Sequence, residues 1–131
     1  MHITTLLGDQ IARYLDLSSL ELKLTAQNMA NLDTPGYRTV GIDFAQEMER
    51  SLGEIAEERN RESDTGSRRY RWTGPAVAKV DGLLDRPDGN NVSMDREGLK
   101  MSEAQLQFKI GVALIRNEFT GILDAIHADS K

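Results

Sequence analysis

Ala30-Asn31-Leu32-Asp33-Thr34-Pro35-Gly36-Tyr37 is the stretch that decides how this chain folds. Pro35 fixes its own φ and pushes Thr34 towards extended backbone, so no helix runs through these positions. Pro followed by Gly suits the two central positions of a type II turn, because Gly36 accepts the positive φ of the second position. Asn31 is predicted to cap the preceding helix in a left-handed conformation. The stretch therefore predicts that a long helix stops here and that the chain reverses.

The residues before this turn, from about position 4 to 31, have the pattern of an amphipathic helix. Two apolar rows run along it, and two rows on one helix predict more than one neighbour, since a single partner needs a single seam. The chain has little other hydrophobic material, so we expect the second row to pack against other subunits. The first row contains Leu15 and Leu22, and the second consists of Leu17, Leu20 and Leu24.

The C-terminal part carries the most regular helical pattern in the chain. Its apolar residues follow one another in steps of four, three, four, three and four, which is the spacing of a coiled-coil a/d seam. The pattern predicts a helix over residues 102–127 and favours its extension back to position 95. We expect Ile115, Phe119 and Ile122 to pack against the N-terminal helix. The complete seam consists of Phe108, Val112, Ile115, Phe119, Ile122 and Ile126.

The middle of the chain predicts one short helix and then irregular structure. Asp43 has the position of an N-cap, with Gln46 three residues later as in a capping box, and apolar residues continue at helical spacing to about residue 58. Glycines and prolines then recur through residues 59–91, which predicts irregular structure. Within this region, 70–73 and 76–80 are predicted as hairpin strands around Gly74-Pro75. The expected fold is mainly α, a single domain divided into 1–37, 38–58, 59–91 and 92–131.

The composition excludes several function classes. The 131 residues fit one domain, and a formal charge of −5 argues against a general nucleic-acid binder, although residues 68–72 mix arginines with aromatics. No cysteine is present, so thiolate metal sites and a cysteine nucleophile are excluded. His2 and His127 lack ligand partners at metal-binding spacing, and no pattern places paired carboxylates in a pocket. We expect no enzyme activity, no cofactor and no small-molecule substrate.

The signature stretch resembles a known family. Residues 28–37, which include Asn28, Ala30 and Tyr37, followed by Asp43-Phe44, resemble the N-terminal signature of flagellar axial proteins, the rod, hook and hook-associated subunits. Residues 88–92, with Asp95, Glu97, Leu106, Phe108 and Ala125-Ile126, resemble the C-terminal third of basal-body rod proteins in that family. The resemblance covers about the first 45 and the last 40 residues and leaves the middle unmatched.

The resemblance implies a structural subunit of the proximal rod, at the inner-membrane end of the periplasmic drive shaft. Its implied partners are further copies of itself, other rod proteins, the rod–ring junction protein and the membrane ring. The start of the chain lacks the pattern of a cleavable secretory signal, which by itself predicts a cytoplasmic protein. The resemblance implies instead export through the flagellar type III apparatus. A soluble helical adaptor or export chaperone is the alternative, and it would explain the amphipathic helices but not the signature.

Overall fold

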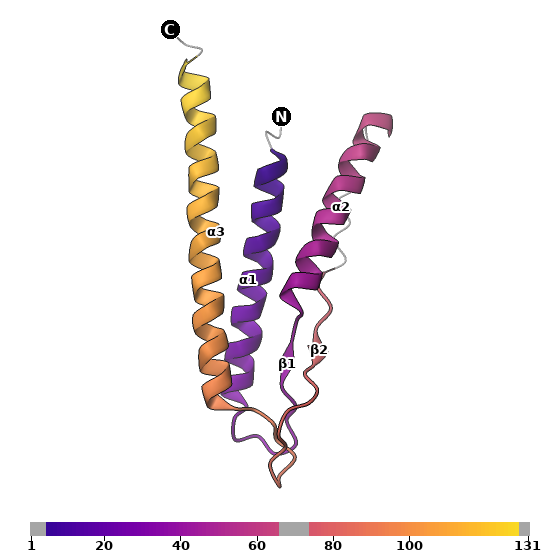
Figure 1. Ribbon diagram of the computed structural model, residues 1–131, viewed down its shortest axis with the longest axis vertical. Coiled ribbons are helices and arrows are strands. Elements are labelled where there is room, and N and C mark those ends of the chain that lie inside the picture. Colours follow the sequence, from indigo (N-terminus) through magenta and orange to yellow (C-terminus); the bar gives the residue numbers. More distant parts are fainter. Residues whose placement is uncertain (1–4, 66–73, 129–131) are drawn as a thin grey trace.

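The computed structural model describes residues 5–65 and 74–128, and it is mainly helical, as predicted. Helix α1 spans Leu6–Ala30, α2 spans Phe44–Thr65 and α3 spans Met94–Ala128. Two short strands, β1 (Val40–Gly41) and β2 (Ala78–Lys79), lie in the connections. The long N-terminal and C-terminal helices pack side by side and run antiparallel, which confirms the predicted pairing (Figure 1).

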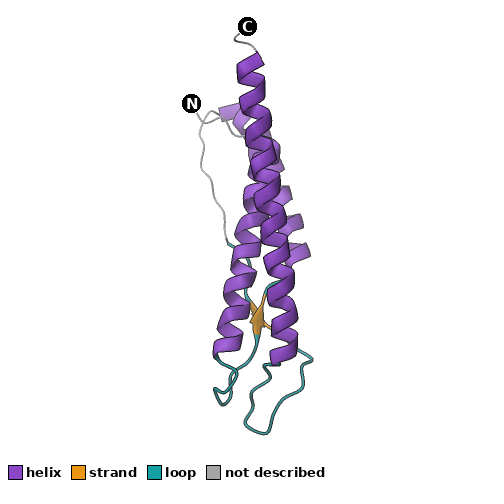
Figure 2. Cartoon of the chain, turned by 90° about the vertical axis from the view of Figure 1, so that its left-hand side faces the viewer, coloured by secondary structure: helices purple, strands orange, loops and turns teal. Residues whose placement is uncertain are grey.

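The three helices form a single layer. Helix α1 lies in the middle, with α3 on one side and α2 on the other, and seen edge-on the helices overlap in one narrow column (Figures 1 and 2). Among the described residues, α2 and α3 do not pack against each other. A stable domain usually needs two packed layers around one core. This arrangement therefore leaves both broad faces of the layer without a covering element among the residues that the structure describes.

The second predicted apolar row of α1 faces the interior of the chain, whereas it was expected to pack against other subunits. Leu17 is 1% exposed and Leu24 is buried as well, so these two side chains are not available to neighbouring subunits. The expectation was wrong for both because α1 is the middle helix, and its apolar rows have neighbours in the same chain on two sides. Helix α2 is held to α1 partly by an edge-to-face contact between Tyr14 and Phe44, whose ring centroids lie 5.4 Å apart.

The helix ends follow local chemistry, with one exception at α1. The Thr5 hydroxyl accepts a hydrogen bond from the Gly8 amide at 2.9 Å and caps the start of α1. Asn31 does not adopt the predicted left-handed conformation, since its φ is −103° and its ψ is 18°. Its side-chain nitrogen instead donates to the Gln27 carbonyl at 2.9 Å, so the helix end is satisfied without a positive φ.

The end of α2 differs from the prediction, whereas α3 begins within one residue of the predicted extension to position 95. Asp43 accepts from the Gln46 amide at 3.0 Å, which confirms the N-cap of α2, but the helix continues to Thr65 rather than ending near residue 58. No glycine or proline stands at positions 59–65 to stop it. Helix α3 begins at Met94, so Ser102 lies inside the helix and its hydroxyl donates to the Gly98 carbonyl at 3.1 Å.

Strand β2 has a partner that the sequence did not predict. β2 pairs antiparallel with β1, with Val40 opposite Lys79 and Gly41 opposite Ala78. The expected partner of β2, residues 70–73, lies outside the described part of the chain. β1 follows the signature turn directly. The contacts that hold this turn against distant residues therefore also hold β1 beside β2. No helix of the described chain combines the length and the apolar character needed to cross a bilayer.

Candidate functional site

A polar cluster joins the signature stretch to the start of α3 at the end of the molecule where the connecting loops lie (Figure 1). We call this cluster the signature clamp. Most of its members are buried, so their polar atoms need partners inside the protein. The clamp consists of Asn28, Tyr37, Thr39, Asn90, Asn91, Arg96 and Glu97.

Asn28 lies at the centre of the clamp and uses both ends of its amide. The nitrogen donates to the Glu97 carboxylate at 2.9 Å and to the Val40 carbonyl at 2.8 Å. The oxygen accepts from the Tyr37 hydroxyl and from the Val40 amide, each at 3.1 Å. One side chain of α1 thus holds the signature, β1 and α3 in fixed positions. Asn28 belongs to the stretch that resembles the family signature, and these contacts give it a structural role.

Glu97 is the buried charge of the clamp, with 0% of its surface exposed. Besides Asn28, its carboxylate accepts from the neighbouring Arg96 at 3.1 Å, and Arg96 also donates to the Thr39 hydroxyl at 3.2 Å. Thr39 in turn donates its amide to the Asn91 side chain at 2.7 Å. A buried carboxylate is tolerated only when it is paired and hydrogen-bonded, and the clamp supplies both conditions.

Asn90 connects the loop before α3 to the end of α1. Its side-chain nitrogen lies within hydrogen-bonding distance of three carbonyl oxygens, those of Asn31 at 3.0 Å, Leu32 at 3.1 Å and Thr34 at 2.8 Å. Its side-chain oxygen accepts from the Val92 amide at 2.7 Å. These carbonyls belong to the turn that follows α1, so Asn90 fixes this turn from 56 or more positions away in the sequence.

The reversal after α1 is the predicted type II turn. The Tyr37 amide donates to the Thr34 carbonyl at 3.2 Å, and Gly36 has a φ of +72°. The Gly36 amide also donates to the Asp88 carbonyl at 2.9 Å. Gly89, another positive-φ glycine, lies so close that a Cβ on it would be 3.5 Å from the Gly36 Cα. The two turns therefore pack against each other, and this contact links the N-terminal signature to residues 88–92.

Replacing Gly36 with valine tests the turn. A Cβ at Gly36 meets no atom within 4 Å, so the only cost of the change is the positive φ, which a β-branched residue resists. We expect Gly36→Val to lower the free energy of unfolding by about 1–3 kcal/mol, measured by urea denaturation. Gly53→Val is the control, because Gly53 also has open space but no positive φ. Equal effects of both changes would contradict the assignment.

The seam between α1 and α3 is built from small and polar residues of α3. Glu97, Ala104 and Gly111 are buried and follow one another at intervals of seven residues. A Cβ on Gly111 would lie 2.7 Å from Leu15 Cδ2 and 3.1 Å from Tyr14 Cδ1, so the two helices approach each other closely there. Sequence reasoning missed this row because it looked for large apolar residues. The regular spacing of Glu97, Ala104 and Gly111 was the available signal.

The predicted α3 seam divides between two environments. Ile115 and Ile122 are half-buried beside α1, whereas Phe119 is 58% exposed. On α1, Leu15, Leu20 and Leu22 are half-buried. The expected packing of Phe119 against α1 is therefore wrong, because the small residues of α3 occupy that seam. The exposed members of the predicted seam are Phe108, Val112, Phe119 and Ile126, and Leu99, Leu106, Ile110, Leu114 and Leu123 are exposed as well.

The ionised form of Glu21 is disfavoured at the interface between α1 and α3. Burial raises the pKa of its carboxyl group, and Glu103 of α3 raises it further, while Lys100 opposes the shift. A raised pKa means that the folded chain binds the proton more tightly than the unfolded chain does. Stability is therefore highest when Glu21 is protonated, and it falls as the pH rises through and above the normal range of a glutamate.

We therefore expect Glu21→Gln to melt at a higher temperature than the unaltered chain at pH 7. The difference should shrink near pH 4, where the carboxyl group of the unaltered chain takes up its proton. Thermal unfolding followed by circular dichroism at both pH values checks this. Glu49→Gln, at an exposed position of α2, is the control. A loss of stability at pH 7 in the Glu21 variant would show that the charged form is favourable.

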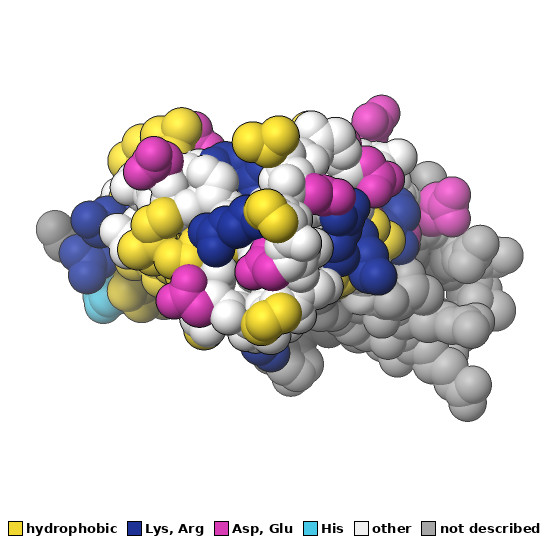
Figure 3. All heavy atoms as spheres, turned by 90° about the horizontal axis from the view of Figure 1, so that it is seen from below, with side chains coloured by type: hydrophobic (Ala, Val, Ile, Leu, Met, Phe, Trp, Pro, Cys, Tyr) yellow, Lys and Arg dark blue, Asp and Glu magenta, His cyan; other side chains and the backbone are white. Residues whose placement is uncertain are grey.

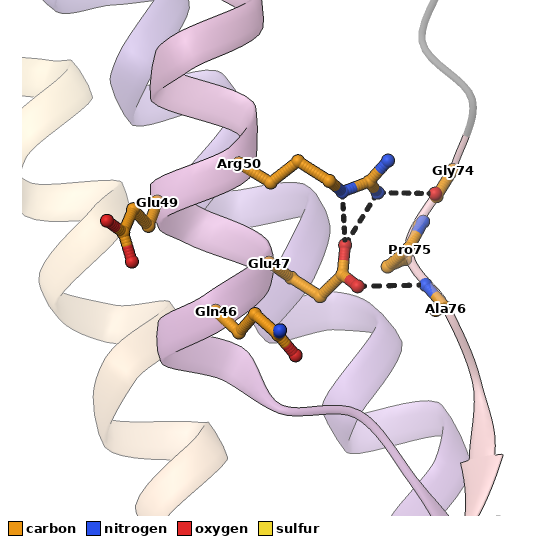
Figure 4. A pocket seen from close by; sticks show the side chains of 7 residues that line it. All are labelled: Gln46, Glu47, Glu49, Arg50, Gly74, Pro75 and Ala76. Carbon is orange, nitrogen blue, oxygen red and sulfur yellow. Dashed lines mark hydrogen bonds and ion pairs between the residues drawn. The ribbon is translucent and has the colours of Figure 1, made fainter.

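A second polar contact fixes the chain after residue 73 to α2 (Figure 4). The buried Glu47 carboxylate accepts from Arg50 at 2.6 Å and from the Ala76 amide at 3.1 Å, and Arg50 donates to the Gly74 carbonyl at 2.7 Å. The hydrogen bond to Glu47 raises the pKa of Arg50. A hollow of about 630 Å³ lies beside this pair. Its polar groups already bind the backbone, so the contact positions a loop rather than a ligand.

The rest of the described surface shows no site for chemistry. At the clamp end, acidic and basic side chains are interspersed with apolar ones, so no face of a single charge is visible there (Figure 3). No cluster of metal-ligating side chains occurs within residues 5–65 and 74–128. Residues 68–72, the arginine-rich stretch, lie outside the described part. What the structure offers is a clamp that fixes two helices and an apolar helix face without a cover.

Comparison with known proteins agrees with this picture. The flagellar basal body rod protein FlgB of Cereibacter sphaeroides is 30% identical over 123 residues, which cover 90% of this chain and 91% of that protein. This chain belongs to the FlgB family of flagellar basal body rod proteins. FlgB of Salmonella typhimurium is 29% identical over 86% of each chain, and FlgB of Escherichia coli K12 is 28% identical over 126 residues. No family model matches the sequence.

Membership of the FlgB family makes the chain a structural component of the rod in the bacterial flagellar basal body. The similarity extends through the middle of the chain, which the signature resemblance had left unmatched. In the clamp, the resemblance had pointed to Asn28, Tyr37, Asn90, Asn91 and Glu97, but their mutual contacts were not predicted. Thr39 and Arg96 were missed entirely, because a threonine or an arginine beside a turn carries no distinctive pattern.

Proposed function

We propose that the chain is a subunit of the proximal rod and polymerises through its N-terminal and C-terminal helices. The observation that supports this most is the uncovered apolar face of α3. Nine large apolar side chains between Leu99 and Ile126 are more than a third exposed. These side chains lie on two sides of α3, and this much exposed apolar surface is rare on a soluble monomer and marks protein interfaces. Neighbouring subunits in a helical polymer would cover it.

The proposed mechanical role follows from the packing. Protein interiors are close-packed and resist shear, so a polymer whose helices interlock across subunits transmits torque along its axis. The clamp supports this role because it fixes α3 relative to α1 through buried hydrogen bonds. The chain acts on no substrate and holds no cofactor in this proposal. Nucleic acid is not among its partners.

The proposed location is the inner-membrane end of the periplasmic rod. The partners there are other rod proteins, further copies of this chain, the rod–ring junction protein and the membrane ring. Delivery occurs through the flagellar type III export apparatus. Locating the chain in isolated basal bodies, by mass spectrometry and labelled electron microscopy, tests this placement. Absence from basal bodies, together with swimming of a deletion strain, would instead favour the adaptor or export-chaperone function.

A single substitution on the exposed α3 face tests the interface itself. Phe119→Asp places a charge where the proposed polymer buries an aromatic ring, while in the isolated chain the position faces solvent. We expect the variant to fold and to be made at the normal level but to leave a deletion strain non-motile. Thr120→Asp, at the adjacent exposed position, is the control and should restore swimming. Normal swimming with Phe119→Asp would contradict the proposed interface.

A further inference from the structure

Helix α3 carries two different apolar features on opposite sides, at the same height along its axis. One is a ridge of exposed side chains, which we call the α3 ridge and which consists of Phe108, Val112, Phe119, Leu123 and Ile126. The other is a hollow of about 470 Å³ between α3 and the start of α1, which we call the α1–α3 hollow. Its apolar lining includes Leu7, Ile11, Leu114, Gly121, Ile122 and Ala125.

The opposite placement of the two features follows from helix geometry. Each residue of an α-helix is rotated about 100° from the one before it, so positions two apart point in nearly opposite directions. Val112 of the ridge is followed two positions later by Leu114 of the hollow. Phe119 and Gly121 have the same relation, as do Leu123 and Ala125. The ridge therefore lies on one side of α3 and the hollow on the other.

We propose that the α3 ridge of one copy of this chain seats in the α1–α3 hollow of a second copy. This inference rests on the proposed function, and it specifies which surfaces of the subunit meet. The hollow has room for a large side chain, because a Cβ on Gly121 would meet no atom within 4 Å. Leu7 and Leu114 at the hollow are each about half exposed, at 51% and 47%. An inserted aromatic ring would bury both.

The charges beside the two features are complementary. Arg116 is exposed on the helix turn between Val112 and Phe119 and forms no ion pair with any residue that the structure describes. Glu118 lines the hollow, and one of its carboxylate oxygens accepts from the Thr5 hydroxyl at 2.5 Å. Its other oxygen has no partner among the described residues. A ridge entering the hollow brings a guanidinium towards this carboxylate, a favourable charge-assisted pairing that a non-polar partner would not supply.

The proposed contact also explains why assembly continues. The ridge and the hollow are different surfaces, so the contact is heterologous. A row of bound copies therefore keeps a free ridge at one end and a free hollow at the other. A heterologous contact that does not close on itself produces a helical polymer. A symmetric contact of ridge with ridge would stop at a dimer.

Disulfide cross-linking in isolated basal bodies tests the proposal directly, because the chain has no cysteine of its own. Leu123→Cys with Gly121→Cys places one thiol on the ridge and one at the hollow, while Phe119 is kept. The two thiols point in opposite directions on one helix, so they cannot bond within a chain. We expect a ladder of dimers, trimers and longer products on oxidation. Each single-cysteine variant should give none alone, and a dimer when the two are co-expressed.

Other outcomes of this experiment would overturn the proposal. Cross-links to a different basal-body protein would mean that the hollow or the ridge meets another partner. Dimers from Leu123→Cys alone would indicate ridge against ridge. Basal bodies that contain the chain without any cross-link would reject the contact but leave the rod function standing. Basal bodies that lack the unaltered chain would reject the rod function itself.

A filled hollow gives an independent test. Gly121→Leu introduces no clash in the isolated chain and replaces a glycine inside a helix, so folding should be unharmed. We expect it to lower the amount of chain recovered in basal bodies by about tenfold, as the loss of an interface hot spot does. Gly98→Leu, on the same helix and also in open space, should assemble normally. Normal recovery of the Gly121 variant, or equal losses in both variants, would contradict the proposal.

Discussion

Asn28→Ala is expected to lower the free energy of unfolding by at least about 3 kcal/mol, a large fraction of the stability of a domain of this size. The substitution removes one of the two partners of the buried Glu97 carboxylate, and it removes the partner of the Tyr37 hydroxyl and of both backbone groups of Val40. Each buried polar group left without a partner costs about 1–3 kcal/mol, and a charged one costs more. Urea denaturation of the purified chain measures the loss.

Two control variants separate the clamp from a simple loss of an amide. Asn31→Ala removes a half-buried side chain whose bonds reach only Gln27 and Thr34, so its effect should be below about 1 kcal/mol. In the double variant Asn28→Ala/Glu97→Leu the buried carboxylate that lost its amide partner is gone, and part of the lost stability should return. If Asn28→Ala and Asn31→Ala destabilise equally, the clamp does not have the central role assigned to it.

Gly111→Leu is expected to cost about 2 kcal/mol in the free energy of unfolding, because it forces α1 and α3 apart. Even a methyl group at this position would contact Leu15 Cδ2 at 2.7 Å and Leu15 Cγ at 3.0 Å. Overpacking a well-filled seam costs about 1–3 kcal/mol, and the cost rises when the side chain is large. The better helix propensity of leucine returns up to about 1 kcal/mol.

The comparison that isolates the steric effect uses a second glycine of α3. Gly98→Leu has the same change in helix propensity but meets no atom within 4 Å, so it should leave the stability equal or higher. Thermal melts of the two variants, followed by circular dichroism, measure the difference. A combined Gly111→Leu/Leu15→Ala variant should recover part of the loss, since it removes the atoms that the new side chain meets. Failure to recover any would place the strain elsewhere.

The local features of this chain were readable from the sequence because they depend on neighbouring residues. The turn at Thr34–Tyr37 follows from the fixed φ of Pro35 and the conformational freedom of Gly36. The Asp43 cap follows from a side chain that reaches an amide three residues later. The two long helices follow from apolar spacing. Each of these features is decided within one or two turns of backbone, so the sequence alone was sufficient.

The tertiary structure decided which faces turn inward. Spacing showed that Phe119, Val112 and Ile115 lie on one side of a helix, but it did not show that Gly111 and Ala104 would take the seam. Small residues occupy the seam because they let two backbones approach closely and bring more atoms into contact. The same close approach buries Glu97, which is possible only because Asn28 lies 69 positions away in the sequence and beside it in space. Pairing between distant residues depends on the whole fold, so no local sequence pattern predicts it.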